Sequence, residues 1–402
     1  MRVTVLSQYY PPEIGAPQRR LEQLVTGLVT RGHQAIVLTA LPNYPTGKIF
    51  AGYGGWMREE MDAGARVIRT FIYPTQSTEF VKRMSSYASF VLSSLLVGLF
   101  RAPPSDYLFT ESPPLFLGIT GLVLSRAKKA RWIFNVSDLW PQSAVELGVL
   151  RSGIGLRLSE RLEALCYQKA WLVSGQSASI IDNIRTRFPK TRTYLFSNGV
   201  NTAQFSPHFR NGKFGECVSD PTRPIALYAG LHGIAQGLDQ ILDAAQLAGG
   251  TLAAEIFLLG DGPTKTDLMQ RARRDDLKHI HFLDSAPANA IPEWVASADI
   301  ALIPLKHHIP GAVPSKIYEA MASGVAILLV ASGEAAEIVR KHDAGLVVAP
   351  GDTLGLANSL QTLAGDAALR ARLGANGRRA AELYFDRRMI VQRFVEYLEQ
   401  NL

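Results

Sequence analysis

Short apolar runs alternate with longer segments of helical spacing along the first half of the chain. The run at 2–6 predicts a strand, and 17–31 predicts a helix because its apolar residues recur every three or four positions. A loop at 11–15 separates the two, Gly32 ends the helix, and a second strand follows at 35–39. Strand, loop, helix and strand in this order form a βαβ unit of a parallel sheet. Further strands are predicted at 67–71, 107–110, 131–136, 170–174 and 193–196.

The same alternation starts again at 224–230. Residues 206–223, just before it, are polar and rich in turn formers without periodicity, so we place the hinge between two domains there. The predicted fold class is α/β, with one doubly wound, Rossmann-like parallel sheet in each half. The second half is expected to contain helices at 237–247 and 266–274 and strands at 255–259, 280–283, 300–304, 326–330 and 345–348.

Composition agrees with two globular domains. The 402 residues are 47% hydrophobic and 19% charged, which is too apolar for a disordered or fibrous protein and long enough for two sizeable cores. The two cysteines, Cys166 and Cys217, are too few for a disulfide framework and stand in no metal-binding spacing, which argues against zinc and iron–sulfur chemistry. The first residues lack the pattern of a signal peptide, so we expect a cytoplasmic protein.

Positive charge is concentrated in the first half. The net charge is +7, and residues 1–205 carry 23 Lys and Arg against 13 Asp and Glu, whereas the remainder carries 19 against 22. A basic half indicates contact with an anionic surface, either nucleic acid or anionic lipid, and solvated charge without a partner is the third alternative. We find no interleaved aromatic and basic motif, so we expect no nucleic acid partner.

Two apolar stretches bear on the membrane question. Residues 87–100 and 115–124 are both shorter than the ~20 residues that a membrane-spanning helix needs. The first follows Lys82 and Arg83 and precedes Arg101, which suits a helix lying in the membrane interface. A buried helix of a large α/β domain explains the stretch equally well, and the basic first half favours membrane contact.

Glycine-containing turns suggest where anions bind. Gly15 and Ala16 open the first helix, with Arg19 in its first turn, and a helix N-terminus there favours phosphate. The alternative is a glycine needed only for a tight turn. The sequence Gly260-Asp-Gly lacks the third glycine of a dinucleotide fingerprint, because Lys265 stands in its place, and the chain has no P-loop. The first absence argues against a nicotinamide dehydrogenase, and the second excludes a P-loop ATPase.

The segment 310–324 carries the strongest chemical signal. Pro314 fixes the entry to a helix, and Ser315 is predicted to cap it. Lys316 in the first turn has the wrong sign for the helix dipole unless an anion shares the site. Glu319, one turn later, is placed to accept hydrogen bonds from two vicinal hydroxyls. Diphosphate and ribose in this order describe a nucleotide-diphosphate sugar; the alternative is a surface Lys–Glu pair.

These residues stand in blocks that resemble glycosyltransferase family four, and in particular the bacterial L-N-acetylfucosamine-type transferases of surface polysaccharide synthesis. The resemblance runs almost end to end, and its last block is the most specific. The blocks are Tyr10-Pro-Pro-Glu-Ile-Gly15, Arg31-Gly-His33, Asp138-Leu-Trp-Pro141, Asn198-Gly-Val200 with Phe205, Leu259-Gly-Asp-Gly-Pro263, Ala298-Asp299 and Pro314-Ser-Lys-Ile-Tyr-Glu-Ala-Met-Ala-Ser-Gly324.

The resemblance implies a GT-B fold, in which two Rossmann-like domains face each other across a cleft. It implies an acceptor-side domain at 1–205, a nucleotide-sugar domain at 206–385 and a terminal helix, 386–402, that crosses back to the first domain. It also implies a retaining, metal-independent transfer without a cofactor, from a nucleotide-diphosphate donor that is expected to be a UDP-linked N-acetylated amino sugar. Gly230, Gln236 and Gly237 then join the donor-binding set.

The chain departs from the family pattern at three donor-site positions. Gly311 replaces the first glutamate of the Glu-x7-Glu element, whose second glutamate is Glu319, and Leu231 and Gln236 replace the arginine and lysine that neutralise the diphosphate. A pyrophosphate without cationic partners is a poor leaving group. We therefore expect Lys316 to supply the charge, with Arg19 or Arg20 completing it on domain closure.

Asp138 is the candidate for the acceptor side. It stands near the histidine position of many relatives and is expected to orient or partly deprotonate the acceptor hydroxyl. A buried N-cap for the segment Leu139–Leu147 is the alternative explanation.

The predicted function is transfer of the sugar to a soluble or lipid-linked saccharide in lipopolysaccharide or capsule-type synthesis, at the cytoplasmic side with peripheral contact to anionic membrane. The alternatives are a nucleotide-sugar epimerase and a non-catalytic nucleotide-sugar-binding relative.

Overall fold

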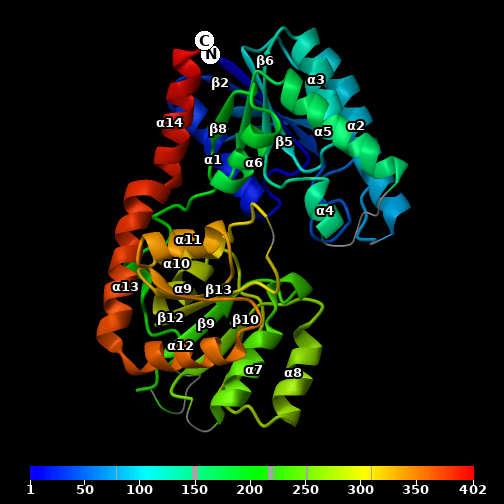
Figure 1. Cartoon of the computed structure of the whole chain (residues 1–402). Helices are drawn as coiled ribbons and strands as arrows, with labels where there is room; N and C mark the ends of the chain where they lie inside the picture. Colours follow the sequence, from blue (N-terminus) through cyan, green and yellow to red (C-terminus); the bar gives the residue numbers. More distant parts are fainter. Residues whose placement is uncertain (78, 147–152, 216–219, 221, 250–251, 309) are drawn as a thin grey trace. The chain divides into compact units, whose positions relative to one another are not determined.

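The computed structural model describes residues 1–402 except 78, 147–152, 216–219, 221, 250–251 and 309. The chain folds into two units, Met1–Asn198 with Arg387–Leu402 and Gly199–Asp386. Each unit is built around its own largely parallel sheet (Figure 1). The predicted α/β class, with one doubly wound sheet in each half, is confirmed.

The sheet of the first unit has eight strands within the described residues, in the order β3-β4-β2-β1-β5-β6-β7-β8. All neighbouring pairs are parallel except β3 and β4. The strands are β1 (Arg2–Ser7), β2 (Gln34–Ala40), β3 (Met57–Asp62), β4 (Ala65–Thr70), β5 (Tyr107–Ser112), β6 (Arg131–Val136), β7 (Leu172–Gly175) and β8 (Thr193–Leu195).

Strand β3 is not predicted by the hydrophobic pattern. It lies at the sheet edge and pairs with β4 alone, through a turn in which Ala63 and Gly64 have positive φ values of 47° and 81°. Arg58 and Glu59 point to solvent, so the strand lacks the apolar run that marks the buried strands.

Helices cover both faces of this sheet. Phe394 of the terminal helix stacks on Phe196 with the ring centroids 4.5 Å apart, and both rings lie in one core cluster with the first helix. The other face is covered by four helices that share a second cluster with the sheet. The helices are α1 (Ala16–Thr30) and α14 (Arg387–Gln400) on the first face, α2 (Phe80–Arg101), α3 (Leu117–Ala127), α5 (Ile154–Lys169) and α6 (Ala178–Arg187) on the second, and the short α4 (Gln142–Glu146).

Helix α2 is longer than the apolar stretch at 87–100 suggests. Its segment Val81–Arg101 is long and apolar enough to cross a membrane by length and composition, so the expectation that it is too short is wrong. The polar residues before the apolar stretch also continue the helix. However, α2 buries Phe90, Val91 and Val97 in the core of the first unit, and the helix is therefore part of that fold.

The sheet of the second unit has six strands in the part of the chain that is described, all parallel, in the order β11-β10-β9-β12-β13-β14. Each lies where the apolar runs predict it. The strands are β9 (Ile225–Ala229), β10 (Glu255–Leu259), β11 (Ile280–Leu283), β12 (Ile300–Pro304), β13 (Ala326–Val330) and β14 (Gly345–Val348).

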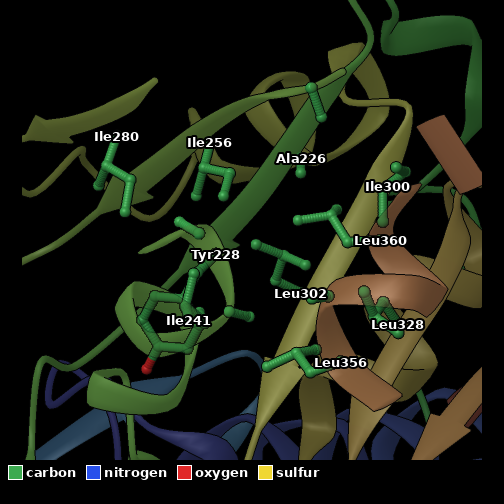
Figure 2. Packing of buried hydrophobic residues seen from close by; sticks show 14 of the residues in the cluster. Ala226, Tyr228, Ile241, Ile256, Ile280, Ile300, Leu302, Leu328, Leu356 and Leu360 are labelled. Carbon is green, nitrogen blue, oxygen red and sulfur yellow. The ribbon is translucent and has the colours of Figure 1, made fainter. Parts of the chain in front are cut away.

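Helices pack on both faces of the second sheet as well. Figure 2 shows one of the two resulting cores, in which Tyr228, Leu302 and Leu328 of the strands meet Ile241 and Leu356 of the helices. The helical elements of this unit are η1 (Pro207–Phe209), η2 (Ile234–Gln236), α7 (Asp239–Ala248), α8 (Lys265–Arg274), α9 (Ile291–Ser297), α10 (Ser315–Ala322), α11 (Glu334–Lys341), α12 (Thr353–Gly365), α13 (Ala367–Ala380) and the π-helical turn η4 (Ala381–Phe385).

The boundary between the units lies at Asn198–Gly199, earlier in the chain than the expected boundary after 205. The amide of Val200 donates to the carbonyl of Phe385 at 2.8 Å. This hydrogen bond ties the segment after Asn198 to the second unit. Phe214, in the expected hinge segment, packs on Phe257 with ring centroids 4.8 Å apart. The described part of 206–223 therefore packs against the second unit, and 216–219 and 221 lie outside the described residues.

Candidate functional site

The candidate site lies at the carboxyl edge of the second sheet, where the strand order reverses. The chain runs outward from β9 to β10 and β11 and then returns to the other side of β9 with β12. In open α/β sheets ligands bind at this switch point, next to the loops that follow the two diverging strands. Here those loops contain Gly230, after β9, and the segment that leads into α10.

Helix α10 begins at Ser315 and has no side-chain cap. Pro314 occupies the N-cap position with φ −59° and ψ 130°, so the prediction of Ser315 as the cap is wrong by one residue. Because Ser315 is already helical, its hydroxyl points along the helix and donates to Glu319 Oε1 at 3.3 Å. Among the described residues, no side chain accepts from the first N–H groups of the helix, an arrangement that suits an anion.

The ammonium group of Lys316 lies close to the backbone of Gly230. Its Nζ is 5.5 Å from the centroid of the Tyr228 ring, and a Cβ added to Gly230 would lie 2.7 Å from the same nitrogen. Among the residues that the structure describes, no carboxylate forms an ion pair with Lys316. Glu319 accepts a hydrogen bond from Ser315 instead. The structure therefore does not contain the surface Lys–Glu pair that was the alternative.

Lys316 and Glu319 also line a common small pocket with Ala229 at the end of β9. Both side chains are partly buried. An ammonium and a carboxylate that share a pocket without pairing leave one donor group and one acceptor group for a ligand. The structure therefore brings together five residues of the predicted donor set: Gly230, Pro314, Ser315, Lys316 and Glu319.

Two glycines, Gly260 and Gly262, allow the loops after β9 and β10 to touch. A Cβ on Gly260 would lie 1.9 Å from the carbonyl oxygen of Gly230, and one on Gly262 would lie 2.4 Å from that of His232. Contacts this short exclude any side chain. The Gly260-Asp-Gly segment therefore has a packing role that sets the position of Gly230, and through it the surroundings of Lys316.

His232 is a buried residue of these loops that the sequence reasoning missed. Its side chain is inaccessible to solvent, and neither ring nitrogen has a hydrogen-bond partner within the described residues. Burial and the positive charge of Lys265 lower the pKa of the imidazole, which favours its neutral form. Its backbone amide donates to Asp261 O at 2.8 Å and its carbonyl accepts from the Thr264 amide at 3.0 Å, so His232 joins the two loops.

The loop between β9 and α7 offers no cation at the two expected positions. Leu231 is 57% exposed, and Gln236 ends the turn η2. Gly237 follows with φ 60°, and a Cβ there would lie 2.9 Å from Lys306 Cα. The side chain of Lys306 forms an ion pair with Asp239 at 3.4 Å. Lys316 is therefore the cation placed at the carboxyl end of β9.

The predicted anion site at the start of α1 belongs to the first unit. Gly15 is the N-cap of α1 in extended backbone, with φ 174° and ψ 172°, and Ala16 is the first helical residue. A Cβ on Gly15 would lie 2.4 Å from Oε1 at the flexible end of the Gln18 side chain, which would have to shift. Arg19 is partly buried and interacts electrostatically with Glu22.

Arg20 is not available for a ligand. Its side chain is 1% exposed and forms a salt bridge with Glu111 at 2.6 Å. It also donates to Ser137 Oγ at 2.5 Å and to Asn198 Oδ1. The expectation that Arg20 completes the diphosphate site is therefore wrong, because its guanidinium stabilises a buried polar network at the carboxyl ends of β5 and β6.

Asp138 lies just after β6 and is only partly buried. Its Oδ2 accepts a hydrogen bond from Ser143 Oγ at 2.9 Å, in helix α4. This contact supports a structural role in holding α4. Of the segment Leu139–Leu147, residue 147 lies outside the described residues.

Glu13 is a second carboxylate at this edge of the first sheet, and it was not predicted as a site residue. It is buried and accepts hydrogen bonds from the backbone amides of Asn43 and Tyr44, both at 2.8 Å. Burial raises the pKa of Glu13, and these backbone hydrogen bonds oppose the rise. Glu13 ties the loop after β1 to the loop after β2.

Within the described residues, no group of three or more His, Cys, Asp or Glu side chains is placed to hold a metal ion.

Comparison with known proteins identifies relatives of both halves of the chain. Residues 15–199 match the family described as "Glycosyl transferase 4-like domain", and residues 223–366 match "Glycosyl transferases group 1". The "Putative colanic acid biosynthesis glycosyl transferase WcaI" of Escherichia coli is 25% identical over 81% of this chain and 82% of its own length. The "Probable glycosyltransferase WbjE" of Pseudomonas aeruginosa is 26% identical over 65% of this chain and 67% of its own length.

Solved structures show the same fold across the whole chain. Anabaena HepE in complex with UDP superposes with a TM-score of 0.73 at 19% identity, covering 100% of both chains. WaaG, a glycosyltransferase involved in lipopolysaccharide biosynthesis, superposes with a TM-score of 0.68 at 16% identity, covering 98% of this chain and 99% of its own.

Proposed function

The chain is a family-four glycosyltransferase of polysaccharide biosynthesis with the GT-B fold, and from this premise we propose that it binds its nucleotide-diphosphate sugar at the start of α10. The diphosphate lies at the uncapped N-terminus of the helix, and Glu319 accepts hydrogen bonds from the ribose hydroxyls. The observation that carries this proposal is the position of Lys316, whose ammonium lies against Gly230 without a carboxylate partner among the described residues.

We propose UDP as the nucleotide and an N-acetylated amino sugar as the transferred group. The structural neighbour HepE was solved with UDP, which supports the nucleotide by analogy. The sugar rests on the resemblance to the N-acetylfucosamine-type transferases, because Gly311 leaves no side chain where relatives hold the sugar with a glutamate. Backbone groups of Gly311–Val313 are the candidates for that contact.

The proposed transfer retains the anomeric configuration. The bond between the anomeric carbon and the β-phosphate oxygen breaks, and the acceptor oxygen forms the new bond on the same face of the sugar. The acceptor proton passes to an oxygen of the departing diphosphate, so the step needs no nucleophile from the protein. Lys316 and the N-terminus of α10 stabilise the negative charge that develops on the leaving group, a contribution of about 100-fold or more in rate.

The acceptor is proposed to meet the first unit. Asp138 is a partly buried carboxylate that accepts a hydrogen bond from Ser143, and its proposed role is to orient the attacking hydroxyl. Gly15, Ala16 and Arg19 remain candidates for a second contact to the donor phosphates. We propose a saccharide acceptor carried by a lipid at the cytoplasmic side of the membrane, and no metal or cofactor in the reaction.

Nucleotide release tests this function. Purified protein is incubated with UDP-, GDP- and ADP-linked sugars, with and without membrane extract containing lipid-linked saccharides. We expect UDP release from a UDP-N-acetylhexosamine that requires the extract, and a loss of about 100-fold in rate for Lys316→Ala but none for Lys341→Ala, an exposed lysine at the end of α11. Isomerisation of the sugar without an acceptor would show an epimerase instead.

A further inference from the structure

Helices α2, α3 and α5 form one layer on the first unit's sheet. They lie side by side on the same sheet face (Figure 1), and α3 contacts both of the others. Each buries its inner side in a common core cluster, for example through Phe90 of α2, Leu124 of α3 and Tyr167 of α5. The opposite side of each helix therefore faces away from the protein.

The outward side of this layer is apolar. On α2, Leu92, Leu96 and Phe100 are 61%, 49% and 82% exposed and stand four residues apart, so they form one stripe along the helix. Single exposed apolar residues are common on soluble proteins, but an array over neighbouring helices marks an interaction surface. The two other helices add Ile119, Val123, Ile154 and Leu158.

The same three helices are strongly basic. Together they carry seven Lys and Arg residues against two Glu residues. Glu163 is buried in a salt bridge with Arg187, which leaves Glu160 as the exposed acid of these helices. The basic residues are Lys82, Arg83, Arg101, Arg126, Arg157, Arg161 and Lys169.

We propose that the outer face of α2, α3 and α5, called here the α2–α3–α5 face, docks on an anionic lipid bilayer. The apolar stripes enter the acyl boundary, and the Lys and Arg side chains lie among the headgroups. A second copy of the chain would bring two basic faces together, whereas anionic headgroups complement them. Helix α2 stays in the protein during docking, because Phe90, Val91 and Val97 belong to the core.

This inference rests on the proposed function in one respect. Docking on the membrane brings the enzyme to the surface in which a lipid-carried acceptor lies. A two-dimensional search along the membrane raises the effective concentration of such an acceptor. The face lies wholly within the first unit, so its test is independent of the donor site.

Vesicle sedimentation tests the α2–α3–α5 face. Wild-type protein is mixed with vesicles of phosphatidylcholine alone and of equal parts phosphatidylcholine and phosphatidylglycerol. We expect binding to the anionic vesicles, weakened by salt, and at least about tenfold weaker binding for Leu92→Glu/Leu96→Glu, because two apolar contacts are lost and two negative charges gained. The control is Leu354→Glu, which changes a leucine of equal exposure (60%) on α12 and should bind like wild type.

Charge-removing variants separate the two components. Arg101→Gln/Arg126→Gln should lower affinity for anionic vesicles by about fivefold per charge and leave the weak binding to phosphatidylcholine unchanged. Far-ultraviolet circular dichroism and UDP binding of each variant should equal those of wild type, which distinguishes loss of docking from loss of fold or of the proposed donor site.

Three results would overturn the inference. The first is equal vesicle binding by wild type and Leu92→Glu/Leu96→Glu. The second is wild-type binding that does not distinguish anionic from neutral vesicles. The third is a wild-type dimer that the double variant dissolves, because the face would then bind a second copy. Absence of UDP binding by wild type would refute the donor proposal and leave the vesicle result standing.

Discussion

Replacing Gly230 by alanine perturbs the contact on which the proposed donor site depends. The added Cβ would lie 2.5 Å from Lys316 Cε, 2.7 Å from Nζ and 3.3 Å from Tyr228 Oη. Two of these atoms belong to the flexible end of a lysine, which can move aside, but Gly230 has φ 153°, which a residue with a side chain rarely adopts. We therefore expect the free energy of unfolding to fall by about 1–3 kcal/mol, mainly through backbone strain. The displaced ammonium, however, no longer lies where the diphosphate is proposed to bind.

The loss of donor affinity follows from Coulomb's law. At an effective dielectric constant of about 20, a unit charge attracts another with roughly 4 kcal/mol at about 4 Å and roughly 2.8 kcal/mol at about 6 Å. A displacement of about 2 Å therefore costs about 1.4 kcal/mol, which corresponds to roughly tenfold in Kd. Gly230→Ala should bind UDP about tenfold more weakly than wild type in isothermal titration calorimetry.

The control variant is Gly212→Ala, at a glycine with φ 69° whose added Cβ would meet nothing within 4 Å. It carries the backbone strain of a positive φ without the steric contact, and its UDP affinity should equal that of wild type. An unchanged UDP affinity in Gly230→Ala, with thermal unfolding also unchanged, would refute the reasoning. A loss of stability much larger than that of Gly212→Ala would contradict the claim that Lys316 can move aside.

Three further predictions concern the site and its support. Glu319→Gln should weaken UDP binding about tenfold and leave pyrophosphate binding unchanged in parallel titrations, because the carboxylate is proposed to hold the ribose; equal losses for both ligands would contradict that role. Burial and Lys265 lower the pKa of His232, so the unfolded imidazole takes up a proton first as the pH falls below about 6.5, and stability declines there. His232→Gln should flatten the part of the pH–stability curve between about 7 and 5, measured by urea denaturation, and an unaltered curve would exclude His232 as its cause. Arg20→Met leaves Glu111 buried without its partner at 2.6 Å and should lose about 3–5 kcal/mol, of which the double variant Arg20→Met/Glu111→Leu recovers part; a loss below about 1 kcal/mol would contradict the buried network.

The strands of both sheets could be predicted because each buried parallel strand is a short apolar run between turn residues. Ile256 and Leu328, for example, stand in such runs and are inaccessible in the structure. Strand β3 has no such run, because an edge strand that faces solvent needs none. The unit boundary also differs from the predicted one, because Val200 and Phe205 are buried in the core of the second unit. Two isolated apolar residues of this kind leave no periodic pattern in the sequence.

The candidate site was predicted in part. Lys316 and Glu319 share one helix, so their spacing already places them on neighbouring turns. Their relation to Gly230 depends on the loops after β9 and β10 touching at Gly260, a contact between residues far apart in the chain. The family resemblance supplied that relation, whereas hydrophobic spacing could not.

Arg20 and His232 show what sequence reasoning cannot assign. Arg19 and Arg20 are neighbours of the same type, yet Arg20 is buried with Glu111 and Arg19 is partly accessible. The rotation of the helix about its axis decides which arginine points into the core. It also depends on Glu111, a partner about ninety positions away in the chain. A single histidine in a glycine-containing loop gives no sign of burial either, because the rings beside it, Tyr228 and Phe282, belong to strands β9 and β11.

Isothermal titration calorimetry at low salt tests the placement of the diphosphate at the start of α10. It gives the Kd of UDP for wild type, Lys316→Ala and Lys341→Ala. Loss of one cation at about 4 Å from the diphosphate predicts at least about tenfold weaker binding by Lys316→Ala, and none for Lys341→Ala. Equal UDP affinity in all three proteins would contradict the assignment of the diphosphate to the start of α10.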